Sequence, residues 1–232
     1  MLEIDIKPVG DAALQVVVGD RIDGEVVSRV WSLARAIDAA GGGAFLDIVP
    51  AYTSVLVRYD PLRVDQAIAM ALVRGASETA TESLSANART VTIGVLFGGE
   101  WGVDFETAAH ELGMREARFR DAFCKPDYRV AFLGFLAGFP YLLGLPPALA
   151  LPRLATPRPR VPAGSVGVAA LQCGIYPRQS PGGWRLLGRT LAPLFDPSLP
   201  APALLAPGDV VRFEPAASIE ETARVDITGG AA

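Results

Sequence analysis

The chain has 232 residues, half of them apolar, and can therefore bury the core of one large domain or of two small ones. Its 21 Lys and Arg residues and 25 Asp and Glu residues give a formal net charge of −4, which supplies no broad phosphate-binding face and argues against a nucleic-acid partner. One histidine and two cysteines cannot build the usual zinc or iron–sulfur clusters, so we expect no metal site. The first residues include two acids and no apolar signal core, which predicts a cytoplasmic protein.

Residues 1–80 carry the pattern of an N-terminal α/β domain. Alternating apolar residues predict short strands, and apolar residues at helical spacing predict helices. Glycines at 41–43 end the first helix, and Asp60 with Pro61 opens the second. In chain order, the predicted elements are strands at 2–6 and 13–18, a helix at 22–39, strands at 45–49 and 54–59, and a helix at 64–74.

A polar segment rich in Ser, Thr and Ala follows, and we place a linker between two domains at residues 81–89. The second domain, residues 90–216, is predicted to begin with a strand and two short helices. We expect the strand at 90–97 and the helices at 105–112 and 115–124, with Asp104 as the N-cap of the first helix.

Beyond Tyr128 the sequence pattern changes to short runs of Val, Leu and Ile separated by Gly and Pro. Closely spaced turn signals of this kind predict a closed or sandwiched β structure. The polar end of the chain, residues 217–232, is expected to be a flexible tail.

Val130 to Leu151 is a stretch of 22 residues without a charge, which is long enough to cross a bilayer as a helix. It also contains three glycines and three prolines, including the pair Pro146-Pro147. Because prolines remove backbone donors and break helices, a buried strand followed by a tight apolar loop is the better interpretation, and we expect no membrane association.

Three arginines, Arg153, Arg158 and Arg160, lie close together in the proline-stiffened run LPRLATPRPRVPAGSV. Guanidinium groups on a rigid segment are suited to bind a carboxylate or phosphate with two hydrogen bonds. An equally supported interpretation is that they bind loop carbonyls and surface acids.

The segment QCGIYPRQSPGGWRLLGRT places Gly182 and Gly183 beside Trp184. Glycines allow the backbone to approach a ligand closely, and the aromatic ring can form one wall of a pocket. The alternative is a β-bulge or hairpin turn with Trp184 in the core. No nucleophile elbow surrounds Ser180, which we expect to act at most as a hydrogen-bond donor.

Taken together, these segments resemble the family of the 5-oxoprolinase B subunit (PxpB), which is also described as allophanate hydrolase subunit 1 and includes the kinase inhibitor KipI. The matching stretches run in the family's order from residue 10 to residue 213. They are GDAALQVVVGDRID, VPAYTSVLVRYDPL, FGGEWGVDFETAAHELG, YRVAFLGFLAGFPYLLGLP, PRLATPRPRVPAGSVGVAALQCGIYPRQSPGGWRLLGRT, LFDP and LLAPGDVVRF.

The resemblance implies an α+β protein in which the N-terminal α/β domain precedes a cyclophilin-like β-barrel domain. It also implies partners: the C subunit of 5-oxoprolinase in direct contact and the A subunit, which together with this chain open 5-oxoproline to glutamate at the expense of ATP. We expect ATP with Mg²⁺ to act in the assembled complex and not on this chain alone, because no Walker A sequence occurs here.

The resemblance further suggests a substrate pocket near the contact with the C subunit. Opening a lactam at neutral pH calls for activation and then for stabilisation of developing negative charge, which arginines and backbone amides can supply. No catalytic residue can be named from the sequence. The matching residues, predicted to bind substrate, are Arg153, Arg158, Arg160, Gln172, Tyr176, Ser180, Gly182, Gly183, Trp184, Arg189 and Thr190.

Three positions depart from the family's usual pattern. Ala137 stands where proline is usual, Cys173 where threonine is usual, and Phe123 where a histidine is often seen. The first two are small changes. Loss of a histidine is a larger one and raises the prospect of a changed substrate or of a purely binding role.

The sequence is therefore compatible with two functions of different classes. The first is the B subunit of an ATP-dependent 5-oxoprolinase, inactive alone. The second is a KipI-like inhibitor of a sensor histidine kinase, which would dock through the apolar surface of the barrel. A further alternative is a subunit of an amide hydrolase that degrades allophanate or urea. It would have the same fold and a different substrate.

Overall fold

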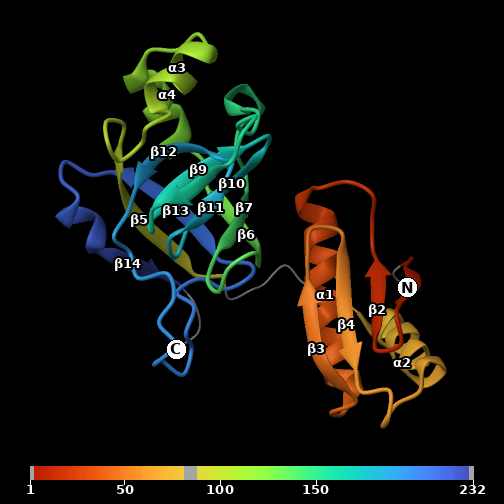
Figure 1. The fold of residues 1–232 in the computed structure, drawn as a ribbon. Coiled ribbons are helices and arrows are strands. Elements are labelled where there is room, and N and C mark those ends of the chain that lie inside the picture. The colour runs from red at the N-terminus through yellow and green to blue at the C-terminus, as the bar shows by residue number, and fades with distance from the viewer. Residues whose placement is uncertain (1–2, 81–87, 230–232) are drawn as a thin grey trace. The chain divides into compact units, whose positions relative to one another are not determined.

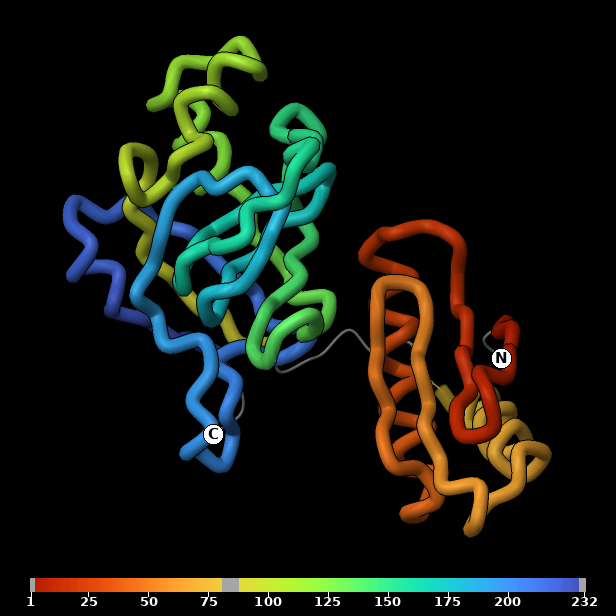
Figure 2. The backbone as a smooth tube through the Cα atoms, in the orientation of Figure 1, coloured from red at the N-terminus to blue at the C-terminus, as the bar shows by residue number. Residues whose placement is uncertain are grey.

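A computed structural model describes residues 3–80 and 88–229, and the chain divides into two compact units, Met1–Ala86 and Asn87–Ala232. Figure 1 shows the elements of each unit, and Figure 2 follows its chain path. Seven residues of the predicted linker, 81–87, lie outside the described part, as do residues 1–2 and 230–232.

The N-terminal unit is a four-stranded sheet with two helices. Every strand pair in it is antiparallel, and the strand order is β1-β2-β4-β3. The elements are β1 (Asp5–Val9), β2 (Ala13–Val17), α1 (Gly24–Gly41), β3 (Phe45–Pro50), β4 (Ser54–Tyr59) and α2 (Gln66–Thr79).

Local chemistry explains where these helices begin and end. The Asp23 carboxylate accepts a hydrogen bond from the backbone N–H of Val26 at 2.9 Å and so caps α1. Gly42 ends α1 in the left-handed conformation at φ 52°, as the glycine run predicted. Asp65, and not the predicted Asp60, caps α2. The core lies between sheet and helices and includes Leu14, Val16, Leu33, Ile37, Val57 and Val73.

The second unit contains a closed seven-stranded β-barrel, which confirms the predicted α+β fold with a separate barrel. The strands follow one another around the barrel as β12-β9-β10-β7-β6-β13-β5, and β12 pairs back onto β5. The bounds are β5 (Thr90–Phe97), α3 (Phe105–Glu111), α4 (Glu116–Cys124), β6 (Tyr128–Leu133), β7 (Pro140–Leu143), β8 (Arg158–Val161), β9 (Ser165–Ala169), β10 (Gln172–Ile175), β11 (Ser180–Gly182), β12 (Arg185–Arg189), β13 (Val210–Pro215) and β14 (Val225–Thr228).

The expected flexible tail is corrected by the structure. Residues 220–223 form a short 3₁₀ turn, and β14 pairs in antiparallel register with the first half of β5. The buried Thr222 side chain accepts a hydrogen bond from the Leu191 N–H at 2.8 Å. Since β12 covers only the last residues of β5, this segment covers the edge that would otherwise stay unpaired.

The end of the predicted linker also belongs to the barrel unit. The Arg89 guanidinium forms an ion pair with the buried carboxylate of Asp209, at the turn before β13. It also donates a hydrogen bond to the Leu204 carbonyl at 3.0 Å. These contacts place the boundary of the second unit before Arg89.

The uncharged stretch 130–151 forms β6, β7 and a 3₁₀ turn at Pro147–Leu149. Its strands are short because Gly and Pro interrupt them. Within the described residues, none of the helices has both the length and the apolar character needed to cross a bilayer.

Candidate functional site

The barrel wall formed by β7, β10, β9 and β12 has two different faces. Val166, Val168, Cys173 and Ile175 belong to the main hydrophobic core of the barrel unit. Successive strand residues point to opposite faces, so their neighbours point outward. A second cluster, which we call the outer aromatic cluster, covers that outward face and consists of Phe139, Val161, Ala169, Tyr176, Trp184 and Leu186, with Leu136 and Tyr141 packed against it.

Glycines create the space that these rings occupy. A Cβ atom at Gly174 would lie 2.8 Å from the ring of Phe139 and equally close to the Pro140 carbonyl. One at Gly182 would collide with the hydroxyl of Tyr176. These glycines of β10 and β11 are therefore required by the packing of aromatic side chains.

The sequence left two interpretations of the Gly182-Gly183 pair. The structure shows the second of them: a register shift, typical of a β-bulge, lies between Ser180 and Gly182, and Trp184 is only 6% exposed. Neither glycine adopts a positive φ. The Ser180 hydroxyl is buried and donates to the neighbouring Pro181 carbonyl at 3.3 Å.

Arg158, at the start of β8, is bound by a buried acid. Its two terminal nitrogens donate to the Asp104 carboxylate at 3.0 and 2.7 Å. Asp104 also accepts the backbone N–H of Leu186 at 2.7 Å, and its side chain is 8% exposed. Asp104 stands at the predicted N-cap position of α3, but its carboxylate makes no capping hydrogen bond and binds Arg158 instead.

Arg153 differs from Arg158 in its surroundings. It is exposed, and it makes neither a hydrogen bond nor an ion pair with any residue that the structure describes. It lies close enough to Tyr141 and Tyr176 to act on both electrostatically. Burial raises the pKa of each tyrosine, and the positive charge of Arg153 offsets part of that rise.

Tyr176 is a buried ring of the outer aromatic cluster, in which Phe139 contacts Tyr141, Tyr176 and Trp184. It is 2% exposed, and the backbone N–H of Trp184 donates to its hydroxyl. Its ring contacts Phe139 edge-on at 5.1 Å between centroids. Arg153 is close enough to this buried ring to act on it electrostatically.

The remaining predicted residues have other surroundings. Arg160 is exposed on β8, and Gln172 is half-buried on β10, on the same face as Tyr176 by strand alternation. Arg189 donates to the Ala163 carbonyl at 2.7 Å, and its guanidinium lies 5.4 Å from the ring of Trp101. The buried hydroxyl of Thr190 donates to the Thr222 carbonyl at 3.1 Å.

Sequence reasoning missed several members of this face. Phe139 and Tyr141 were interpreted only as part of an apolar stretch, although their spacing of two already places them on one side of a strand. Asp104 was interpreted as a cap. The ion pair of Arg185 with Glu111, at 2.6 Å, joins residues far apart in the chain and leaves no local signal.

The three departures from the family pattern lie in different places. Phe123 is fully buried and stacks on Phe213 inside the barrel unit, so it fills the core. Cys173 is also buried, which raises the pKa of its thiol. Ala137 is exposed in the loop between β6 and β7.

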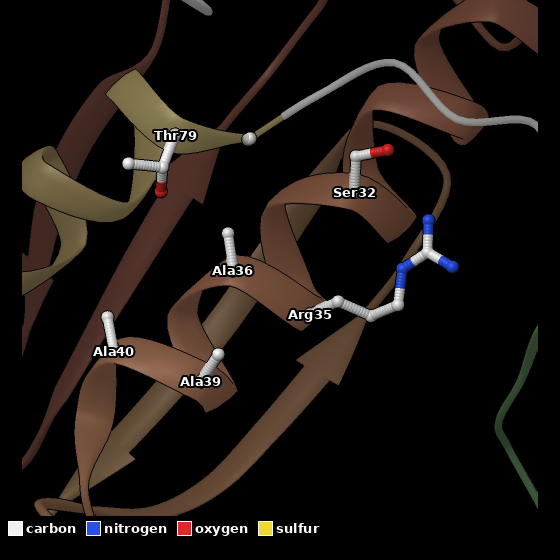
Figure 3. A pocket seen from close by; sticks show the side chains of 7 residues that line it. Ser32, Arg35, Ala36, Ala39, Ala40 and Thr79 are labelled. Atoms are coloured by element: carbon white, nitrogen blue, oxygen red, sulfur yellow. The ribbon is translucent and has the colours of Figure 1, made fainter.

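Several cavities lie away from the predicted residues. Figure 3 shows one of about 580 Å³ in the N-terminal unit, lined by α1 and the end of α2. Another, of about 620 Å³, lies at the turn from α3 to α4 and is lined in part by Arg115, Arg118 and Lys125. Across residues 3–80 and 88–229, no three His, Cys, Asp or Glu side chains gather as a metal site would require.

Comparison with known proteins identifies relatives along almost the whole chain. The model of the family described as carboxyltransferase domain, subdomain C and D, matches residues 4–205. A Bacillus subtilis protein, named as the B subunit of 5-oxoprolinase, is 36% identical over 218 residues, which cover 90% of this chain and 91% of the relative. An Escherichia coli O157:H7 protein of the same name is 39% identical over 190 residues, which cover 81% and 84%.

Solved structures agree with this assignment. TTHA0988 is 40% identical with a TM-score of 0.78, and the match covers 89% of this chain but only 40% of TTHA0988. The uncharacterized protein PH0987 from Pyrococcus horikoshii is 42% identical with a TM-score of 0.54, over 91% of this chain and 97% of that one. The K. lactis urea amidolyase, at 19% identity and a TM-score of 0.79, shares the fold over 97% of this chain and 16% of its own length.

Proposed function

This chain belongs to the carboxyltransferase-domain family, subdomain C and D, and from that membership we propose that it is the B subunit of an ATP-dependent 5-oxoprolinase. The complex would hydrolyse 5-oxo-L-proline to L-glutamate. The observation that carries the proposal is the match, over nine-tenths of both chains, to a relative named as the B subunit of 5-oxoprolinase.

The geometry of the outer aromatic cluster supports a role in substrate binding. 5-Oxoproline has one carboxylate and one small lactam ring. Arg153 offers an unpaired guanidinium for the carboxylate, and it is close enough to Tyr141 and Tyr176 to act on both electrostatically. In this proposal Arg153 binds the substrate, whereas Arg158, bound to Asp104, holds β8 against the barrel.

The proposal assigns ATP and Mg²⁺ to the other two proteins of the complex. One feature favours this division: the sequence has no Walker A segment. The C subunit would contact this chain directly, and the A subunit would complete the assembly. The chain alone is then inactive.

The test is to co-express the chain with its A and C subunits and to measure glutamate released from 5-oxoproline with and without ATP. We expect release only from the complete complex and only with ATP. Arg153→Ala should raise the KM for 5-oxoproline by about tenfold or more, because it removes a charge-assisted hydrogen bond. Arg118→Ala, on α4, is the matched control and should leave the KM unchanged.

An assembled complex without ATP-dependent glutamate release would refute the proposal. Allophanate and urea are then the next substrates to test. Specific inhibition of a sensor kinase's autophosphorylation by the chain alone would instead support the KipI-like alternative.

A further inference from the structure

Phe135 adopts an unusual backbone conformation in the loop between β6 and β7. Its φ is +63°, in the left-handed region that bulky residues avoid. The N–H of Leu136 donates to the carbonyl of Gly134 at 2.6 Å, so Phe135 is the central residue of a γ-turn. In the part of the chain that the structure describes, only Ala170 is another non-glycine residue with a positive φ.

Folding alone does not account for a phenylalanine at this position. Its side chain is 60% exposed, so it contributes little to the core. The loop is held by other groups, since Gly134 donates to the Phe139 carbonyl and Phe139 donates to the Leu136 carbonyl, at 3.1 and 3.0 Å. Strained residues that burial does not explain are concentrated at ligand-binding sites.

The ring of Phe135 lies beside the residues assigned to the substrate. It meets Tyr176 edge-on at 6.4 Å between centroids and Phe139 edge-on at 5.5 Å. Arg153 acts on the same Tyr176. Tyr176 thus has the exposed ring of Phe135 in edge-on contact, and the unpaired cation of Arg153 is close enough to act on it electrostatically. This combination suits a small ligand with an apolar ring and a carboxylate.

We propose that Phe135 is a specificity-determining residue that contacts the apolar ring of the substrate while Arg153 binds its carboxylate. This inference rests on the proposed function, in which the substrate is 5-oxoproline. The γ-turn holds the ring at the surface of the protein, so little ordering is left to occur when the substrate binds.

The test compares three variants in the assembled complex, with kinetics and with thermal unfolding of the chain. Phe135→Gly should raise the KM for 5-oxoproline by about tenfold, because the ring contact is lost, and should change kcat much less. Its unfolding midpoint should be no more than about 2 °C below that of the unmodified chain, because glycine relieves the strain at positive φ. Phe135→Tyr keeps the ring and should keep the KM within about twofold.

Ala170→Gly is the matched control, because it relieves strain at the other positive φ without removing a ring. Its KM should stay unchanged. A KM within twofold of the unmodified complex for Phe135→Gly, a fall of many degrees in its midpoint, or its failure to assemble with the A and C subunits would each overturn the inference. An inactive unmodified complex would refute the proposed function, and this inference with it, whereas an active one isolates the role of Phe135.

Discussion

Arg158 and Arg153 belong to one proline-stiffened segment, yet their surroundings are opposite. Arg158 forms two hydrogen bonds with the buried Asp104. Arg153, five positions earlier, is exposed and forms neither a hydrogen bond nor an ion pair with the residues that the structure describes. The comparison shows that arginines clustered in the sequence can differ in role, one bound to a buried acid and another open to solvent, because each guanidinium takes the partner that the fold places beside it.

The largest effect expected from this comparison is on stability. Arg158→Ala leaves the Asp104 carboxylate buried without its cation, and we expect it to lower the free energy of unfolding by about 3 kcal/mol. Denaturant unfolding measures this loss. Adding Asp104→Ala should cost less than the sum of the two single substitutions, and strict additivity would show that the pair is not coupled.

Two glycines near the outer aromatic cluster can be compared by their effect on stability. Gly174→Ala should lower the free energy of unfolding by about 1–3 kcal/mol, because its Cβ would lie 2.8 Å from the Phe139 ring and from a carbonyl. Gly183→Ala is the control, since its Cβ would meet Pro157 at an ordinary 3.6 Å. Equal losses in denaturant unfolding would contradict the role assigned to Gly174.

Tyr176→Phe should cost about 1 kcal/mol at neutral pH, because the hydroxyl accepts a hydrogen bond from Trp184. Its pH dependence follows from the pKa, which burial raises above the unfolded value of about 10. Above pH 10 the unfolded tyrosine loses its proton while the folded one keeps it, so stability falls as the pH rises. Unfolding measured from pH 8 to pH 11 should show a shallower decline in the variant than in the unmodified chain.

The smallest expected effect is that of Arg153→Ala on stability. An exposed arginine without an ion pair contributes little, so the free energy of unfolding should change by less than about 0.5 kcal/mol. Calorimetry of the Arg153→Ala and Arg158→Ala variants, run together, measures the difference between their free energies of unfolding. A large loss at Arg153 would mean that both arginines stabilise the fold, and the difference between them would disappear.

Much of the fold could be predicted from local pattern. The strand 90–97 and the strand 54–59 were predicted at the observed bounds, because alternating apolar residues fix which face is buried. The prediction of a flexible tail was wrong. β14 pairs with β5, and this pairing joins residues more than a hundred positions apart, so no local pattern could reveal it. The polar residues of an edge strand reflect the side that faces solvent. They do not indicate which strand it pairs with.

The fold class and the family could be predicted from the sequence alone, because periodicity, caps and a long Gly/Pro-rich run are properties of neighbouring residues. The three-dimensional structure was needed to show that Arg158 is bound to Asp104 while Arg153 is exposed, and that Phe135 contacts Tyr176. The physical reason is that ion pairs and ring contacts form between residues distant in the chain, and barrel closure sets those distances.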